Sequence, residues 1–211
     1  MTNRQLARLE GYIQIGRKAI LEFTDRFSCV SSTKLTILTL AKLGIKCTPQ
    51  AVKFAFTVPE LDKAYSCGLS HKELAAVGGP VTHRTTSDGT PGWRGHLVAI
   101  TEDRRYLLDS SLDQVDMAFE EKLGLPTRVY VFSVPANAET DTFGEHGFKL
   151  NIDGVTITGL NFNLQYVTVE DNTYADSPAW NDPGIPFLAH NLANQVRGES
   201  PRNRLKGVQC R

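Results

Sequence analysis

The segment from residue 95 to residue 110 constrains the fold more than any other part of the chain. It consists of two apolar runs around a short charged stretch: Gly95-His96-Leu97-Val98-Ala99-Ile100, Thr101-Glu102-Asp103-Arg104 and Arg105-Tyr106-Leu107-Leu108-Asp109. This pattern is typical of a β-hairpin. A loop centred between Glu102 and Asp103 would set His96 directly opposite Asp109, with Cβ atoms roughly 4.5–5.5 Å apart. We therefore expect an imidazole and a carboxylate side by side on one face of a sheet.

Helices are expected mainly before this hairpin and strands mainly after it. Apolar spacing predicts helices over residues 3–22 and 29–43, the second ended by Gly44, and a third helix over 60–77. Residues 78–92 are rich in Gly, Thr and Pro, which is typical of a loop. Further elements are expected as strands at 51–58, 93–101, 105–110, 129–134 and 164–170, a short helix at 113–123, and a last helix in the second half of 179–196.

A second hairpin is predicted around Asp153-Gly154, a strong turn signal between apolar residues 148–151 and 155–158. The order of all these elements indicates an α+β domain in which N-terminal helices pack on a mostly antiparallel sheet. Residues 1–196 are expected to form this single domain. Residues 197–211 are polar and basic, and we expect them to form a flexible tail.

The overall composition excludes some classes of function. The chain has 211 residues, with 23 basic and 23 acidic side chains, so its formal net charge is zero. No basic face stands out, which argues against nucleic acid as the main partner. No apolar run is long enough to span a membrane, and the polar N-terminus lacks the apolar core of a secretory signal. We therefore expect a cytoplasmic protein whose four cysteines are free thiols.

A hairpin that presents a His–Asp pair can serve a nucleophile, and Cys29 is the candidate. Cys29 is expected in the first turn of the 29–43 helix, with Ser28 as its N-cap. A helix N-terminus and a neighbouring imidazolium both stabilise a thiolate. Asp109 would fix the tautomer of His96 and stabilise its charged form. A thiolate placed in this way attacks a carbonyl carbon and forms a thioester, which a second nucleophile resolves.

The order of these three residues resembles that of the transglutaminase-like, papain-like superfamily, which includes arylamine N-acetyltransferases and bacterial and phage transglutaminase-like enzymes. The resemblance covers roughly residues 20 to 135. The segments that look like the His and Asp motifs are Gly95-His96-Leu97-Val98 and Leu107-Leu108-Asp109-Ser110-Ser111. The resemblance implies a papain-like or transglutaminase-like core, with Cys29 as nucleophile, His96 as general base and acid, and Asp109 as the residue that orients it. The acetyltransferases usually carry Arg-Gly-Gly before the cysteine, whereas this chain has Asp25-Arg26-Phe27-Ser28.

The same resemblance implies thiol-dependent amide hydrolysis or transamidation of a peptide or protein substrate, without a cofactor or a metal. Acyl transfer to an amine from a thioester donor is the enzymatic alternative. A non-enzymatic protein-binding module on the same fold is the third interpretation, with the hairpin region 148–170 as its binding surface. The sequence does not indicate the oligomeric state.

A metal site is a weaker interpretation of two other residues. Cys67 and His71 are four residues apart and would share one face of the predicted 60–77 helix. His83 is nearby in sequence, but no second cluster completes a set of four ligands. We therefore expect no metal.

Three further groups of residues have both a functional and a simpler interpretation. The aromatic residues Trp93, Tyr174 and Trp180 would line a substrate groove or, more commonly for aromatics, belong to the core. Gln14 and Trp93 are candidates, by residue type only, for a side chain that stabilises an oxyanion. Asp113-Gln114 follows Asp109 closely and would either touch substrate or lie at a solvated helix start.

Overall fold

The apolar spacing of the N-terminal residues produces two helices. In the computed structural model, α1 spans Asn3–Phe23 and α2 spans Cys29–Lys42, so both predicted helices are confirmed. Gly44 follows α2 with φ +83°, a left-handed conformation that favours glycine, and the helix ends there. The described residues are 1–23, 29–67, 95–118, 123–134, 149–157, 160–170 and 172–198. The predicted N-cap Ser28, the loop 78–92 and nearly all of the predicted tail lie outside them.

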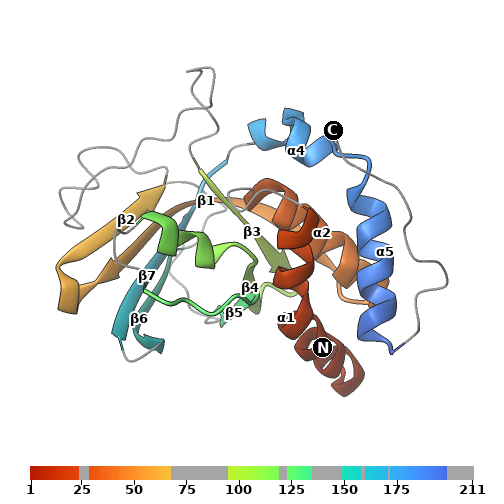
Figure 1. Cartoon of the computed structure of the whole chain (residues 1–211), viewed down its shortest axis with the longest axis horizontal. Helices are drawn as coiled ribbons and strands as arrows, with labels where there is room; N and C mark the ends of the chain where they lie inside the picture. The colour runs from red at the N-terminus through yellow and green to blue at the C-terminus, as the bar shows by residue number, and fades with distance from the viewer. Residues whose placement is uncertain are drawn as a thin grey trace.

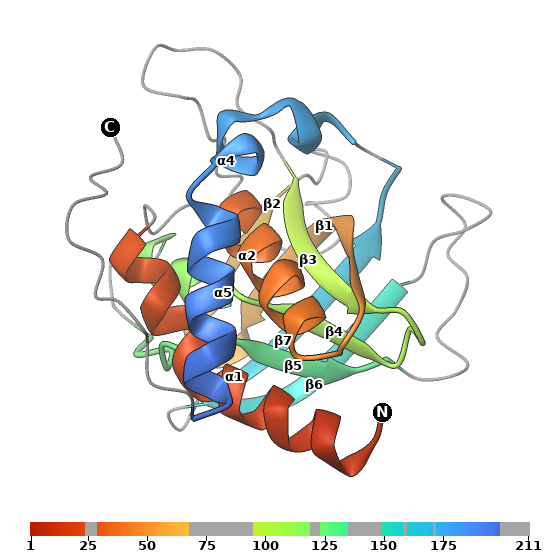
Figure 2. The same cartoon turned by 90° about the vertical axis from the view of Figure 1, so that its right-hand side faces the viewer.

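Helix α2 lies between the sheet and the C-terminal helix α5 (Ile185–Val196), and its residues are buried on nearly all sides (Figures 1 and 2). Two of its threonine hydroxyls donate hydrogen bonds to backbone carbonyls. Thr33 Oγ1 donates to the carbonyl of Leu97 at 2.8 Å, and Thr36 Oγ1 donates to the carbonyl of Ser32 at 2.8 Å. The hydroxyl of Tyr12 on α1 lies 2.7 Å from Thr36 Oγ1. The helical layer is therefore joined to α1 and to the sheet by buried hydrogen bonds.

The described strands form one antiparallel sheet around a long central strand. The sheet runs in the order β5-β4-β3-β1-β7-β6, and β2 also pairs with β1. Its strands are β1 (Cys47–Val58), β2 (Lys63–Cys67), β3 (His96–Thr101), β4 (Tyr106–Asp109), β5 (Tyr130–Ser133), β6 (Lys149–Ile157) and β7 (Leu160–Thr168). The predicted strands at 51–58, 93–101, 105–110, 129–134 and 164–170 are all present, with shifted ends. The fold is α+β, as the order of predicted elements indicated.

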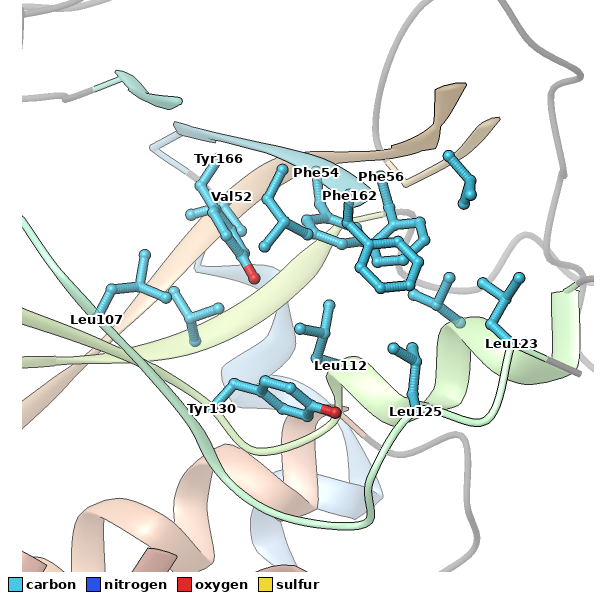
Figure 3. Close-up of a cluster of buried hydrophobic side chains, with 14 of the residues drawn as sticks. Val52, Phe54, Phe56, Leu107, Leu112, Leu123, Leu125, Tyr130, Phe162 and Tyr166 are labelled. Carbon is cyan, nitrogen blue, oxygen red and sulfur yellow. The ribbon is translucent and has the colours of Figure 1, made fainter. Parts of the chain in front are cut away.

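Alternation along the strands supplies two cores, one on each face of the sheet. On the face that carries α1, α2 and α5, Ala99 and Leu108 pack with helical residues such as Leu35 and Leu192. The opposite, concave face is lined with aromatic and aliphatic side chains and is covered by the 3₁₀ helix η2 (Leu112–Ala118) (Figure 3). The labelled residues of this second core are Val52, Phe54, Phe56, Leu107, Leu112, Leu123, Leu125, Tyr130, Phe162 and Tyr166.

The predicted helix over 60–77 is wrong in its described part. A single 3₁₀ turn, η1 (Pro59–Leu61), leads into strand β2, and Asp62 has φ +49° at the turn between them. Along β2, Ala64 and Ser66 are buried while Tyr65 is half-buried, which is the period of a strand. Pairing of this segment with the second half of β1 outweighs its local helical preference.

The predicted turn at Asp153-Gly154 is also wrong, because β6 continues through these residues. The register with β7 shifts between Ile152 and Val155, so the Asp-Gly pair lies in a bulge of the strand. Strand β7 begins at Leu160, which is earlier than predicted, and pairs with β6 as far as Ile157. A glycine in a strand serves a bulge as readily as a turn, so the dipeptide alone did not distinguish the two.

Three short elements complete the described chain. The predicted helix over residues 113–123 is present as the shorter 3₁₀ helix η2. Residues 119–122 of the predicted range lie outside the described residues. Before α5, the chain forms η3 (Thr173–Asp176) and α4 (Pro178–Asn181), and Ser177 Oγ accepts the N–H of Trp180 as the cap of α4. Among the described helices, none combines the length and the apolar character that crossing a bilayer requires.

The close contact of Gly16 with Tyr12 gives a test of the helical layer. Glycine in a helix usually costs about 0.5–1 kcal/mol relative to alanine, so Gly16→Ala would ordinarily stabilise the protein. Here a Cβ on residue 16 would lie 2.7 Å from two ring carbons of Tyr12, which is fully buried. We expect Gly16→Ala to lower the free energy of unfolding by about 1–3 kcal/mol in urea denaturation. The exposed Gln14→Ala on the same helix is the control, and a Gly16→Ala protein more stable than wild type would contradict this packing.

Candidate active site

The three residues expected to act together lie at the ends of three elements. Cys29 is the first residue of α2, His96 is the first residue of β3, and Asp109 is the last residue of β4. The hydrogen bond from Thr33 Oγ1 to the carbonyl of Leu97 joins the first turns of α2 to the start of β3. The beginning of the helix and the beginning of the strand are therefore held at the same end of the fold.

The register of the β3–β4 hairpin differs from the prediction by two residues. Ala99 pairs with Leu108 and Ile100 with Leu107, so the loop is centred one residue later than expected. Arg104, with φ +54°, is the residue in the loop that adopts a left-handed conformation. A shift of two residues keeps side chains on the same face, so His96 and Asp109 become diagonal neighbours instead of directly opposed ones.

The diagonal arrangement still joins the two side chains. Nε2 of His96 lies 2.7 Å from Oδ2 of Asp109, and both side chains are almost completely buried. Oδ2 also accepts the hydroxyl of Tyr166 at 3.0 Å, while Oδ1 accepts the N–H of Ser111 at 3.0 Å and its hydroxyl at 3.4 Å. The ring of Phe54 packs against both His96 and Tyr166, with centroids 5.1 and 5.0 Å apart, and restricts the orientation of the imidazole.

The hydrogen bonds determine the charge of the carboxylate. Burial alone raises the pKa of Asp109, but His96, the Ser111 N–H and the Tyr166 hydroxyl together hold it below its usual value. Burial, with a contribution from Asp109, raises the pKa of Tyr166 well above its usual value, so this hydroxyl keeps its proton. An ionised carboxylate only accepts hydrogen bonds. The proton between the two side chains is therefore on Nε2 of His96.

This tautomer leaves Nδ1 of His96 as the ring nitrogen that can accept a proton. Burial lowers the pKa of His96, but the Asp109 carboxylate and the nearby Cys29 thiol together raise it well above its usual value. Because Nε2 is bonded to Asp109, Nδ1 is the ring nitrogen that is available to a thiol. The structure thus joins His96 to Asp109, and the Cys29 thiol is near enough to influence the pKa of the same imidazole.

Apolar and aromatic side chains surround the thiol. Cys29 belongs to a small buried cluster with Leu97 and Tyr174, against which Trp180 packs. The rings of Tyr174 and Trp180 meet edge to face with centroids 5.0 Å apart. Two of the three aromatics considered in the sequence analysis therefore lie beside the candidate nucleophile. The third, Trp93, is outside the described residues.

Gln114 on η2 reaches the imidazole, which the sequence did not predict. Its Nε2 lies 3.4 Å from Nδ1 of His96, and its Oε1 is buried without a hydrogen-bond partner among the described residues. That Gln114 touches substrate stays a prediction. Gln14, which was considered as a side chain that stabilises an oxyanion, is exposed on α1. The available signal was the short connection between Asp109 and η2, which has to return over the face that carries His96.

A buried ion pair behind the site was also missed. Arg17 on α1 is 1% exposed, and its Nε donates to Oδ1 of Asp113 at 2.7 Å, while its Nη1 donates to Ser32 Oγ at 3.2 Å. Arg17 thereby joins the helix of Cys29 to the element that carries Gln114. An arginine within the apolar stripe of α1 was the signal, because a buried guanidinium requires an acidic partner.

The predicted helical face for a metal does not exist at Cys67, since that residue lies in β2. His71 and His83 are outside the described residues. Among the residues that are described, no cluster of three or more His, Cys, Asp or Glu side chains has a geometry that would hold a metal ion. The hydroxyl of Tyr65 lies 3.0 Å from the sulfur of Cys67 instead.

Comparison with known proteins does not identify the chain. No protein-family model matches it, and neither a curated protein nor a solved structure does. Its function therefore has to be argued from its own residues.

The charge state of His96 gives a test that depends on pH. Because the folded state raises the pKa of His96, its stabilising contribution is complete below the unfolded pKa of about 6.5 and is lost as pH rises through the folded pKa. We expect the free energy of unfolding of wild type to exceed that of His96→Gln by more at pH 6 than at pH 9. Urea denaturation at both pH values measures this difference. An equal difference at pH 6 and pH 9 would show that the imidazole is not protonated preferentially in the folded state.

Proposed function

We propose that this protein is an enzyme that performs acyl chemistry with a cysteine nucleophile, hydrolysing or transamidating an amide of a peptide or protein. The observation that supports it most is the arrangement at His96, whose Nε2 is held by the buried Asp109 and whose other ring nitrogen is left for the Cys29 thiol. The chain order, a cysteine at a helix start followed by a histidine and an aspartate on neighbouring antiparallel strands, also supports a core of the transglutaminase-like, papain-like type. The mechanism requires a reduced thiol, which fits a cytoplasmic location.

The proposed reaction follows from the protonation states of these groups. Nδ1 of His96 takes the thiol proton, and Sγ of Cys29 attacks the carbonyl carbon, so that the C–S bond forms as the carbonyl π electrons move to oxygen. The tetrahedral intermediate then collapses, the C–N bond breaks, and the leaving amine takes the proton from Nδ1. Water or an amine next attacks the thioester carbon and passes its proton to Nδ1, and the sulfur leaves. Asp109 stabilises the imidazolium in each step without taking its proton.

The start of α2 supports the same chemistry. The first N–H groups of a helix have no partner within the helix, and the helix dipole places partial positive charge there. Cys29 is the first residue of α2, so a thiolate and a developing oxyanion would both lie near these groups. The α2 sequence has no acidic residue in its first turn to oppose this effect.

Selective alkylation tests the nucleophile. The structure describes Cys29, Cys47 and Cys67 as free thiols, and burial, with a contribution from Asp103, raises the pKa of Cys47 to about 12. We expect iodoacetamide at pH 6 to label Cys29 before any other cysteine, because the imidazole removes its proton. Peptide mapping by mass spectrometry measures the order of labelling.

The controls separate an enzyme from a binding module. Cys29→Ala should lose the fast labelling and any biological effect while keeping a native thermal melt. Labelling of Cys29 no faster than that of the other thiols would remove its role as nucleophile. A Cys29→Ala protein with a native melt and full biological effect would favour the non-enzymatic module.

The role of Asp109 can be tested with two substitutions, one of Asp109 itself and one of its hydrogen-bond donor Tyr166. Asp109→Asn keeps the shape of the side chain but favours the wrong imidazole tautomer, a change that costs about 10⁴-fold in turnover in a serine-protease triad. We expect a large fall in the rate of Cys29 alkylation at pH 6. Tyr166→Phe removes one hydrogen bond from the same carboxylate and leaves its charge, so its effect should be much smaller. Equal rates for wild type and Asp109→Asn would remove Asp109 from the mechanism.

A further inference from the structure

In the side-chain amide of Gln114, the nitrogen has a hydrogen-bond partner, whereas the oxygen has none among the described residues. Gln114 is 8% exposed, and its Oε1 is buried with no hydrogen-bond partner among the residues that the structure describes. Buried polar atoms are nearly always paired, and an unpaired one costs free energy, so each exception requires an explanation. The exception here lies beside the imidazole of the candidate triad.

The orientation of this amide follows from the tautomer of His96. Asp109 accepts the proton on Nε2, and in the acyl-enzyme, where the proton of Nδ1 has passed to the leaving group and Cys29 is acylated, Nδ1 carries a lone pair and can only accept. The NH₂ group of Gln114 therefore faces Nδ1, at a long distance of 3.4 Å. Because the amide is planar and rigid, Oε1 is directed away from Nδ1 but stays in its immediate neighbourhood. The lack of a hydrogen-bond partner for Oε1 of Gln114 thus follows from the neutral state of the His96 imidazole.

The proposed chemistry brings a nitrogen to this position. Nδ1 gives its proton to the leaving nitrogen, so that nitrogen has to come within hydrogen-bond reach of Nδ1. A nitrogen next to Nδ1 is also next to the Gln114 amide. The nitrogen of a peptide-type amide keeps an N–H that Oε1 can accept. The leaving atom of an ester or thioester has no hydrogen and would turn a lone pair toward Oε1.

We infer that Oε1 of Gln114 accepts the N–H of the nitrogen that leaves from, or attacks, the acyl carbon on Cys29, so that the site selects amides and amines over esters and alcohols. This inference rests on the proposed function and narrows its substrate class. An attacking amine has one hydrogen for Nδ1 of His96 and a second for Oε1 of Gln114. An alcohol has a hydrogen for Nδ1 alone.

Partitioning of an acyl-enzyme tests the inference without knowledge of the natural substrate. p-Nitrophenyl acetate would acetylate Cys29: the C–S bond forms, the ester C–O bond breaks, and p-nitrophenolate leaves. Glycinamide and methanol, both present in excess, then compete for the thioester. Mass spectrometry gives the ratio of N-acetylglycinamide to methyl acetate. The intrinsic difference between the two acceptors cancels when the ratio of a variant is divided by that of wild type.

We expect Gln114→Met, which keeps the length of the side chain and loses both polar ends, to lower this ratio by about 3- to 10-fold, the effect of one neutral hydrogen bond. Gln114→Glu retains an acceptor oxygen and should keep a higher ratio than Gln114→Met. Gln114→Asn, which withdraws the acceptor by one methylene, should also lower the ratio and serves if the Met variant does not fold. Ser110→Ala is the matched control, because it removes a different buried polar atom, a hydroxyl, that also has no partner among the described residues.

The outcomes separate this inference from the proposed function. A ratio that is the same in wild type, Gln114→Met and Gln114→Asn would overturn the role of Gln114 while Cys29 acetylation still supports the nucleophile. A ratio that falls equally in Ser110→Ala would also overturn it, because the effect would then be structural. Failure of p-nitrophenyl acetate to acetylate Cys29 would overturn the proposed function and this inference together.

Discussion

The structure depends on the burial of one charge, the Asp109 carboxylate. Removing a carboxylate from water costs several kcal/mol unless hydrogen bonds replace its hydration. Those bonds come from His96 on β3, from the backbone and side chain of Ser111, and from Tyr166 on β7. In the sheet order, β4 and β7 are separated by β3 and β1, which is about 14 Å in a flat sheet. The hydrogen bond from Tyr166 therefore requires the curled sheet, and it relates the curvature of the fold to the charge of the site.

A second buried charge places the remaining elements of the site. Arg17 on α1 holds Asp113 on η2 and Ser32 on α2 from within the protein. Residue 32 is one helical turn from Cys29, and residue 113 precedes Gln114, so one guanidinium positions the elements of both residues. Buried hydrogen bonds of Tyr12 and Thr33 already join α1 to α2 and α2 to β3. The ion pair of Arg17 adds a directional link from the helical layer to η2 on the concave face.

Local signals in the sequence were sufficient for most strands and for α1 and α2. They also indicated the His96–Asp109 pair, whose hydrogen bond the structure contains. The hairpin register was wrong by two residues because the loop is centred one residue later, with Arg104 in a left-handed conformation, yet His96 and Asp109 still meet, since a shift of two preserves the face. The strand β2 and the bulge at Asp153-Gly154 were missed because pairing with β1 and β7 outweighs local preference. Arg17, Gln114 and Tyr166 each contact residues remote in sequence, and the local patterns did not identify those partners. The His96–Asp109 pair depends on two short segments of the sequence, whereas the residues that support it come from several parts of the fold.

The position of Tyr166 on β7 has a consequence for the synthesis of the chain. A nascent protein leaves the ribosome from its N-terminus, so Cys29, His96 and Asp109 emerge before the strand that carries Tyr166. Until then, one edge of β1 lacks its neighbour β7, and the Asp109 carboxylate lacks one of its donors. Exposed strand edges pair readily with other chains. The final strand of the central sheet therefore closes this edge and completes the electrostatic environment of the histidine in the same event, so that the site matures only when the fold is already protected from aggregation.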